Sequence, residues 1–441
     1  MAALNTRDYH RLDSVLREIT SSSISLKGDE IRAYNKHLTE ILKLKMIPAM
    51  ENVDPLFKCL YKRLMYSGSY YENLKISKPN EFDLNMELEI PASDIQVLTT
   101  RHNGFVQVKV NQFDPNKLKR CLRNYADGEK RLKRWLDDGG LLKREHVLKW
   151  MQGVVDKALQ TFQINDIMIR RSTSGPAITL NITSRVPGTG RVEFSIDLVP
   201  VFIFGTEHWP KPPVRRPVYP SLVTWCVVPK APGYVPPETH WRISFYDQER
   251  RMMTGYGAMK HIIKLMKLLR DCQKWDCLSS YYIKTVFLWE MEKTDRQFWQ
   301  QSIGFLFVHM LKRFVYHLKE MKSIPFYWDS RHSLISGLRP DTIINIGNRI
   351  DQVVRNIERN LPDNPDVVKI YFPGHNRQVA AVNQSLLSGL IESLASTNHP
   401  QQGQRQEGLG VWATVGIGAA VGIAALGAGL LFNLGRRQAN N

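Results

Sequence analysis

Residues 81–90 alternate acidic or polar side chains with large apolar ones, and this period of two predicts a β-strand. Side chains two positions apart in a strand share a face, so Glu81 and Asp83 would lie about 6.6 Å apart along the backbone. Phe82 and Leu84 would face a core. Two crowded carboxylates repel each other unless cations neutralise them, and their hard oxygen atoms suit Mg²⁺ or Mn²⁺. The pair therefore predicts a metal site, whereas acids on a solvated edge strand are the competing interpretation.

Two further features extend this candidate site. Upstream, Gly68 and Ser69 fit a turn in which a residue without a side chain lets the backbone approach a phosphate and the hydroxyl adds a donor. Two metal ions that hold an attacking hydroxyl and a leaving phosphate need a third acid. Alternation in FSIDLVP puts Ser195 and Asp197 on one strand face, so we expect Asp197 to supply that acid.

The chain of 441 residues mixes strand and helix patterns along its length. Strands are predicted at 81–90, 105–110, 177–183 and 192–204, and helices at 26–46, 117–150, 258–272, 280–292, 298–321 and 341–359. These patterns indicate an α+β fold with a mixed-sheet lobe, a helical lobe and a ligand cleft between them. The expected domains are an N-terminal helix with the core lobe (1–225), a helical lobe (226–395) and a polar linker (396–410).

Residues 411–432 carry no charged side chain, and Thr414 is their only polar one. As a helix they would span about 33 Å, enough to cross the hydrocarbon core of a bilayer. We therefore expect a C-terminal transmembrane helix, with a buried core helix as the alternative. Residues 1–13 hold no apolar run of signal-peptide length, so the expected arrangement is a cytosolic body tail-anchored in a membrane. The sequence leaves the identity of that membrane open.

The chain is basic, with 60 Lys and Arg against 42 Asp and Glu and a formal net charge of +18. Residues 117–149 hold eleven of these cations against five acids. The residues expected to contact nucleic acid are Lys117, Lys119, Arg120, Arg123, Lys130, Arg131, Lys133 and Arg134. Such a face favours salt-sensitive binding to a duplex backbone, although a solvated helix face or an anionic membrane partner would give the same pattern. The five cysteines contain no CxxC pair and predict reduced thiols without zinc.

The segment GSYYENLKISKPNEFDL (68–84) resembles the animal cyclic GMP-AMP synthases and the related synthase-like receptors of the Mab-21 family, within the nucleotidyltransferase superfamily. The similarity resumes at VPKAPGYVPPETHWRISF (228–245), IKLMKLL (263–269) and LSSYYIKTVF (278–287). Four collinear blocks cover roughly residues 25–360 and imply the bilobal nucleotidyltransferase fold.

The resemblance also implies roles for matching residues. Glu81, Asp83 and Asp197 would hold two divalent ions, and Asp197 would help activate the attacking ribose hydroxyl. The implied ATP-binding residues are Ser69, Glu81, Asp83, Lys267, Ser280, Tyr281 and Lys284. The implied GTP-binding residues are Asp197, Arg242, Ser244 and Glu249. Tyr246 departs from the family, whose synthases have a serine there, so guanine selectivity is less determined than catalysis.

The implied activity joins ATP and GTP into a cyclic GMP-AMP type messenger that acts on a STING-type receptor in innate immunity. Residues 246–261 lack the cysteines of the synthases' zinc insertion, so the chain more nearly resembles the insect receptors, some of which respond to double-stranded RNA. This resemblance implies double-stranded RNA as the activator, with double-stranded DNA as the second choice. Two alternatives stay open: an inactive Mab-21-type binding scaffold, and a template-independent polymerase or oligoadenylate synthase that makes linear products.

Overall fold

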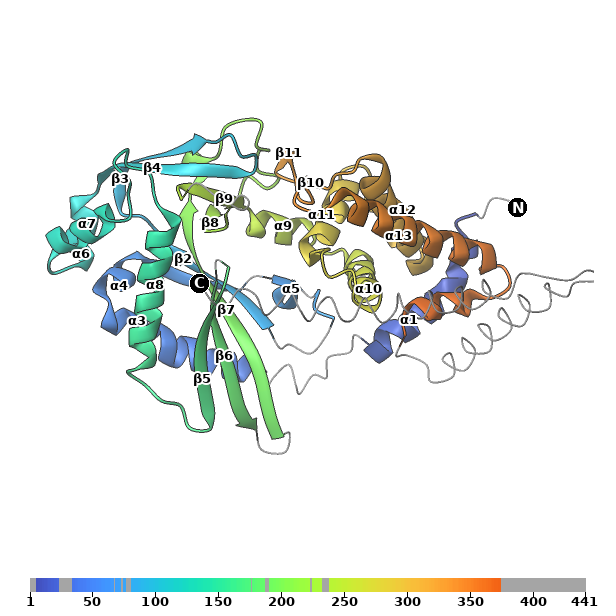
Figure 1. Cartoon of the computed structure of the whole chain (residues 1–441), viewed down its shortest axis with the longest axis horizontal. Helices are drawn as coiled ribbons and strands as arrows, with labels where there is room; N and C mark the ends of the chain where they lie inside the picture. Colours follow the sequence, from blue (N-terminus) through green and yellow to red (C-terminus); the bar gives the residue numbers. More distant parts are fainter. Residues whose placement is uncertain are drawn as a thin grey trace, which may run out of the picture. The chain divides into compact units, whose positions relative to one another are not determined.

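The computed structural model describes residues 5–23, 34–66, 68–72, 74–76, 81–175, 177–186, 190–222, 224–231 and 238–373. All of them lie in one compact unit, residues 1–379. Within this unit a twisted sheet with its own helices forms one lobe, and a helical bundle forms the other (Figure 1). The expected α+β architecture is therefore present.

A nine-stranded mixed sheet organises the first lobe. Its strands are β1 (Tyr61–Tyr66), β2 (Glu81–Leu88), β3 (Ala92–Thr99), β4 (Phe105–Phe113), β5 (Ile167–Ser174), β6 (Ala177–Val186), β7 (Gly190–Phe204), β8 (Trp225–Val228) and β9 (His240–Ser244). The order is β1-β2-β7-β8-β9-β4-β3, and β6 pairs with both β5 and β7. Strand β2 pairs with β1 on one side and, in parallel, with β7 on the other. The alternative of a solvated edge strand is therefore wrong, and Phe82 and Leu84 are fully buried as predicted.

Helices cover the apolar side of the sheet and build the second lobe. Those of the sheet lobe are η2 (Thr39–Met46), α3 (Ile47–Val53), α4 (Pro55–Leu60), α5 (Gly68–Tyr71), α6 (Pro115–Cys121), α7 (Tyr125–Lys133) and α8 (Arg144–Leu159). The helical lobe contains α1 (Arg11–Ser23), α9 (Tyr246–Met252), α10 (Gly257–Cys272), α11 (Ser280–Met291), α12 (Ile303–Val315), α13 (Pro340–Asn360) and the hairpin β10 (Pro325–Phe326) to β11 (Asp329–Ser333). Helix α1 packs on α12 and on η6 (Pro365–Tyr371), so the two ends of the described chain meet in one bundle.

The helix expected over 117–150 is divided into α6, α7 and α8. The side chains of Asp114 and Asn124 accept backbone N–H groups at the starts of α6 and α7, which makes each a helix N-cap. Gly140, with φ +81°, then turns the chain between α7 and α8. The helix expected over 26–46 is present from residue 34, and residues 26–33 lie outside the described residues.

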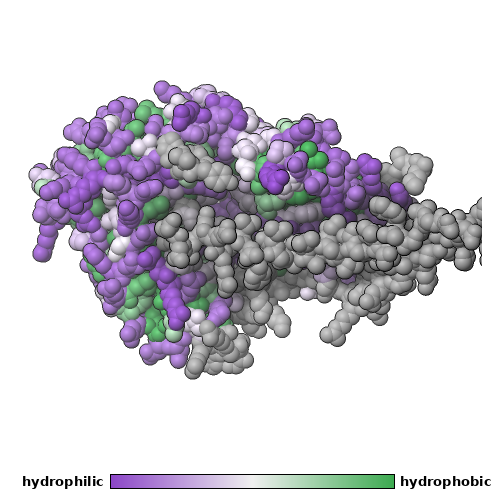
Figure 2. All heavy atoms as spheres, viewed as in Figure 1, coloured by the Kyte–Doolittle hydropathy of each residue, from purple (hydrophilic) through white to green (hydrophobic). Residues whose placement is uncertain are grey.

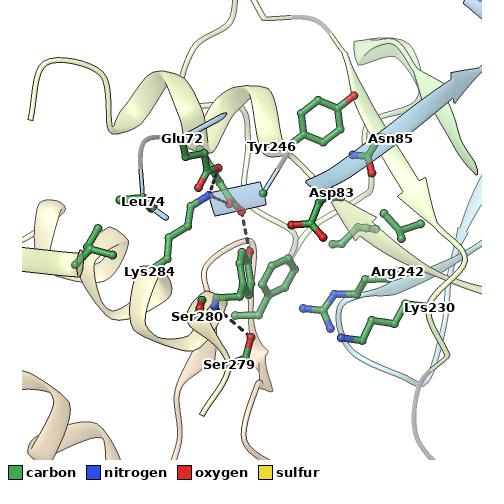
Figure 3. A pocket seen from close by; sticks show the side chains of 18 of the residues that line it. Glu72, Leu74, Asp83, Asn85, Lys230, Arg242, Tyr246, Ser279, Ser280 and Lys284 are labelled. Carbon is green, nitrogen blue, oxygen red and sulfur yellow. Dashed lines mark hydrogen bonds and ion pairs between the residues drawn. The ribbon is translucent and has the colours of Figure 1, made fainter. Parts of the chain in front are cut away.

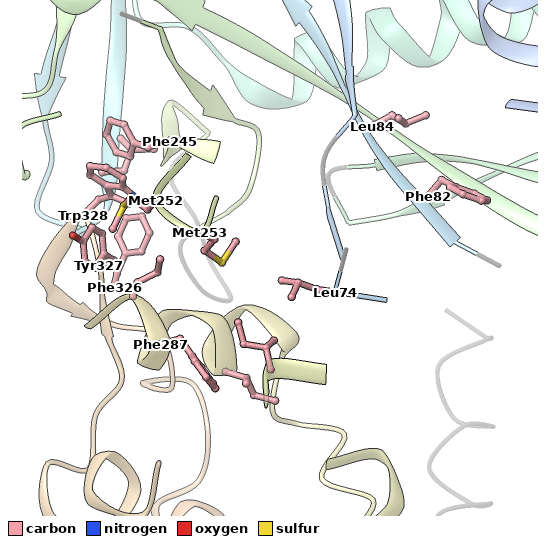
Figure 4. Packing of buried hydrophobic residues seen from close by; sticks show 14 of the residues in the cluster. Leu74, Phe82, Leu84, Phe245, Met252, Met253, Phe287, Phe326, Tyr327 and Trp328 are labelled. Carbon is pink, nitrogen blue, oxygen red and sulfur yellow. The ribbon is translucent and has the colours of Figure 1, made fainter. Parts of the chain in front are cut away.

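Strands β8 and β9 come from the region expected to start the helical lobe, yet they belong to the sheet. The boundary at residue 225 therefore falls at the start of a sheet strand. An aromatic cluster joins this part of the sheet to the β10–β11 hairpin (Figure 4). The ring of Phe245 lies 4.4 Å from that of Trp328 and 4.7 Å from that of Trp209. This contact fixes the hairpin beside β9.

Two expectations need correction. None of the helices in the described residues is both long and apolar enough to cross a membrane, so the part of the chain that the structure describes does not bear out the transmembrane helix that we expected. Residues 411–432, on which that expectation rested, lie outside the described residues. The structure also joins Cys59 of α4 to Cys121 of α6 in a disulfide, so the prediction of five reduced thiols is wrong. Helices α4 and α6 pack together although the two cysteines are 62 residues apart in sequence.

Candidate active site

Strands β2 and β7 bring the three candidate metal ligands together. Asp83 and Asp197 are register partners in the parallel pair, and Glu81 lies opposite Ser195. One carboxylate oxygen each from Glu81, Asp83 and Asp197 lies within 4.8 Å of the other two. Residues more than a hundred positions apart therefore form one cluster of oxygen ligands.

The cluster concentrates negative charge. Desolvation raises the pKa of Asp83 to about 6, and the charges of Glu81 and Asp197 raise it further, while Lys75 and Lys267 oppose the change. Lys75 and Lys267 therefore do not offset the combined effect of burial and the two neighbouring carboxylates on this pKa. Hard oxygen atoms under uncompensated charge fit divalent cations such as Mg²⁺ or Mn²⁺. The residues present therefore fit the metal pair that the sequence predicts.

Thr179 of β6 is part of this site, although the sequence analysis did not single it out. It is the register partner of Asp197 in the antiparallel β6–β7 pair, and its hydroxyl donates to Asp197 Oδ1 over 2.6 Å. The hydrogen bond fixes one oxygen of the carboxylate and leaves the other for a ligand. Only the pairing of β6 with β7 distinguishes Thr179 from other strand threonines, and no local pattern gives that pairing.

Gly68 begins α5 with φ +76°, as the predicted turn requires. A Cβ atom at this position would lie 2.1 Å from Asp83 Oδ2, so the glycine lets the backbone pack directly against the carboxylate. The side chain of Ser69, expected to contact the triphosphate, lies outside what the structure describes.

A cavity of about 460 Å³ opens beside the acids and is lined by both lobes (Figure 3). Its lining contains most of the residues implied by the resemblance: Glu81, Asp83, Arg242, Ser244, Glu249, Lys267, Ser280, Tyr281 and Lys284. It also contains Glu72, Asn85, Lys230, Tyr246 and Phe326, which the sequence analysis did not propose as ligands. In the view of Figure 3, Arg242 and Lys230 lie on one side of Asp83, and Glu72 and Lys284 lie on the other.

The two candidate phosphate-binding lysines are held differently. Lys267 donates to the backbone oxygen of Leu74 over 2.7 Å, and within the described part of the chain it forms no ion pair. Burial lowers its pKa to about 8, assisted by the charges of Arg270 and Lys75. Lys284, in contrast, lies 2.6 Å from Glu72 Oε1 and 2.9 Å from Glu249 Oε2. Two carboxylates thus neutralise Lys284, and a phosphate would have to compete with them.

Glu249 also organises the aromatic wall of the pocket. Its Oε1 accepts hydrogen bonds from Tyr281 Oη at 2.7 Å and from Trp328 Nε1 at 2.9 Å. With Lys284 on Oε2, both carboxylate oxygens already have partners in the protein. Glu249 therefore fixes the orientation of the Tyr281 ring. Its partners within the protein explain the position of the carboxylate without a bound nucleotide.

Tyr246 also lines the pocket, and its hydroxyl donates to Glu87. Glu87 is almost completely buried and also accepts a hydrogen bond from Arg63 Nε at 2.6 Å. Burial and the nearby negative charges raise the pKa of Tyr246 well above its usual value. The phenol is therefore neutral, and its O–H is already used in a hydrogen bond to Glu87.

The predicted nucleic-acid face lies on α6 and α7 and on the residues just after each helix, at the end of the sheet lobe where Figure 2 shows mainly hydrophilic residues. Lys119, Arg120, Arg123, Lys130, Lys133 and Arg134 are exposed there. Arg131 instead points inward, where its Nη2 lies 2.5 Å from the buried carboxylate of Asp54. Lys117 pairs with Glu89 at 3.3 Å. Of the eight predicted residues, only Arg131 has a buried partner within the described chain, and the ion pairs of Lys117 with Glu89 and of Lys133 with Glu129 lie at the surface.

Comparison with known proteins gives the family. The sequence model of the Mab-21 protein nucleotidyltransferase domain matches residues 70–255, and that of the Mab-21 protein HhH/H2TH-like domain matches 258–352. A cyclic GMP-AMP synthase-like receptor of Ctenocephalides felis is 33% identical over 88% of this chain and 94% of its own length. One of Tribolium castaneum is 34% identical over 80% of this chain and 90% of its own length. The chain belongs to the Mab-21 family, among the cyclic GMP-AMP synthase-like receptors.

The Mab-21 assignment confirms the resemblance on which the sequence analysis relied. The two family domains meet between residues 255 and 258, at the start of α10. The first contains Asp83 and Arg242, and the second contains Lys267 and Tyr281, so the pocket lies where the two Mab-21 domains meet. The chain is a nucleotidyltransferase of this family, and such proteins use nucleotide substrates.

Proposed function

We propose that this chain is a metal-dependent enzyme that joins ATP and GTP into a cyclic GMP-AMP type dinucleotide. The observation that carries the proposal is the convergence of Glu81, Asp83 and Asp197, of which Glu81 and Asp83 line a pocket whose other walls hold cations and an aromatic ring. Two phosphoryl transfers need this combination, because the reaction depends on positioning and on neutralising phosphate charge.

Each wall of the pocket has a distinct task in this proposal. Two divalent ions, Mg²⁺ or Mn²⁺, would neutralise phosphate charge and lower the pKa of the attacking hydroxyl. Glu81, Asp83 and Asp197 would hold them, and Thr179 orients Asp197. Lys267 brings a cation without a carboxylate partner in the described residues. The fixed ring of Tyr281 offers a stacking surface for a base.

We propose that duplex nucleic acid activates the enzyme by binding the exposed cations of α6 and α7. The six exposed side chains support contacts with several phosphates, and double-stranded RNA is the preferred activator, with double-stranded DNA as the second choice. The product would serve as a second messenger in innate immune signalling, read by a STING-type receptor. The proposed compartment of the catalytic body is the cytosol, where both substrates are available.

The test incubates the full chain with ATP, GTP, Mg²⁺ or Mn²⁺, and either duplex RNA or duplex DNA, and separates the products by chromatography. A cyclic product that depends on metal and duplex supports the proposal. Asp83→Asn should abolish it, whereas Asp94→Asn, at an exposed acid of β3, should retain it. Linear oligomers would support the polymerase alternative, and the absence of any nucleotide product under all conditions would support the binding scaffold.

A further inference from the structure

Arg242 of β9 lines the pocket and lies between two aromatic rings. Its guanidinium carbon lies 4.3 Å from the ring centre of Phe326 and 5.4 Å from that of Phe105. These rings restrict the plane of the guanidinium, because a planar cation binds best over an aromatic face. The orientation within that plane has to come from a hydrogen bond.

That hydrogen bond comes from His332 of β11, whose Nε2 lies 2.8 Å from Arg242 Nη1. Arginine can only donate, so the imidazole accepts at Nε2 and carries its proton on Nδ1. Within the described residues Arg242 forms no ion pair with a carboxylate, in contrast to Lys284. The guanidinium thus keeps its charge and four further N–H donors for a ligand.

His332 is itself held tightly. Its ring meets Phe105 edge-on at 5.9 Å and Phe326 at 6.2 Å. Gly104 closes the third side, where a Cβ atom would lie 3.4 Å from the imidazole, and its N–H donates to Asp329 Oδ2 over 2.9 Å. Burial and the charge of Arg242 lower the pKa of His332 to about 4, so the ring is neutral at physiological pH.

We propose that His332 is a positioning residue that aims Arg242 at the acceptor base and thereby sets a preference for guanine; this inference rests on the proposed function. An arginine fork matches the adjacent acceptors O6 and N7 of guanine, whereas adenine presents a donor at N6. The neutral imidazole of His332 accepts one N–H and so orients the Arg242 guanidinium without cancelling its positive charge. A carboxylate in the same place would bind two N–H groups and remove the charge that the base needs.

The first experiment measures GTP and ATP binding to the full chain by calorimetry without divalent ions, so that it does not depend on turnover. His332→Leu should weaken GTP binding about tenfold, the value of one good hydrogen bond to a charged group. Its effect on ATP should stay below about twofold. His332→Gln keeps an acceptor and should bind GTP within about threefold of the unsubstituted chain. His208→Leu, at a half-exposed histidine outside this pocket, is the matched control.

The second experiment repeats the series with both nucleotides, metal and duplex RNA. The KM for GTP should rise about tenfold in His332→Leu, while kcat and the KM for ATP stay within about twofold, and His332→Gln should restore the KM. Three results would overturn the inference. They are equal losses for both nucleotides, no recovery in His332→Gln, and normal GTP binding by His332→Leu while Arg242→Ala binds GTP weakly. Failure of the unsubstituted chain to bind GTP would overturn it too. GTP binding without any dinucleotide product would instead reject the proposed function, and the binding series would still decide the role of His332.

Discussion

Thr179 and Asp197 lie opposite each other on antiparallel strands and share a 2.6 Å hydrogen bond. Thr179 is 8% exposed, so little water could replace its hydroxyl. Without this donor, Asp197 can rotate away from the position where Asp83 and Glu81 meet it. The orientation of the third acid therefore depends on a neutral residue of β6.

Thr179→Val removes the hydroxyl and keeps the shape of the side chain. We expect the rate of nucleotide transfer to fall by about tenfold or more, because a hydrogen bond to a charged group contributes about 1.5–3 kcal/mol. Thr179→Ser retains the hydroxyl and should stay within about threefold of the unsubstituted chain. Single-turnover kinetics would check both. Equal rates in the valine and serine variants would show that the hydrogen bond does not orient the acid.

Gly68→Ala should abolish transfer without unfolding the chain. Alanine is strained at φ +76°, and its Cβ would lie 2.1 Å from Asp83 Oδ2, so either the turn or the carboxylate has to move. The matched control is Gly153→Ala in the middle of α8, where a Cβ has no neighbour within 4 Å. That variant should keep full activity and gain about 0.5–1 kcal/mol of stability. Normal transfer by Gly68→Ala would mean that the close approach to Asp83 is dispensable.

The local patterns of the sequence predict much of this architecture. Strict alternation identifies β2 and the central part of β7 with their buried faces, because the period of two is long enough there to be unambiguous. Strand β8 has four residues, three of them fully or almost fully buried, so it shows no alternation. A run of that length cannot be assigned to the sheet from sequence alone.

The acids of the site could be predicted and the state of its lysines could not. Glu81 and Asp83 are neighbours in sequence, so their crowding is visible in the chain. The pairing of Lys284 with Glu72 joins residues 212 positions apart and depends on how the residue after α5 reaches α11. The same holds for Arg131, whose partner Asp54 is 77 positions away. Local patterns give residue types and faces, whereas ion pairing depends on tertiary packing.

Arg131 and its neighbours on α7 should therefore respond differently to charge reversal. Arg131→Glu would place a second negative charge against the buried Asp54 and should destabilise the fold by roughly 3 kcal/mol. Lys130→Glu combined with Arg134→Glu, at exposed positions, should leave the unfolding midpoint nearly unchanged. Thermal unfolding of the two variants checks this contrast.

The double variant should also weaken duplex RNA binding and reduce the slope of log K against log salt by about 2, since each lost phosphate contact removes about 0.9. Lys293→Glu with Lys322→Glu, exposed on the helical lobe, changes the net charge equally and serves as the control. If the control lowers the slope as much as the α7 pair, net charge and not this face governs binding.

The half-buried imidazole of His332 should make stability depend on pH in a defined window. Its pKa is lowered from 6.5 to about 4 by burial and by Arg242 and Lys230, while Asp329 opposes the change. The unfolded chain therefore binds a proton below pH 6.5 that the folded chain accepts only near pH 4, so stability falls as pH decreases through this interval. Each unit of pKa difference corresponds to about 1.4 kcal/mol, so the free energy of unfolding should fall by up to about 3 kcal/mol. His332→Gln should not show this loss. Urea unfolding of both proteins from pH 7 to pH 4 checks this difference, and parallel curves would show that His332 takes up its proton equally in the folded and unfolded chains.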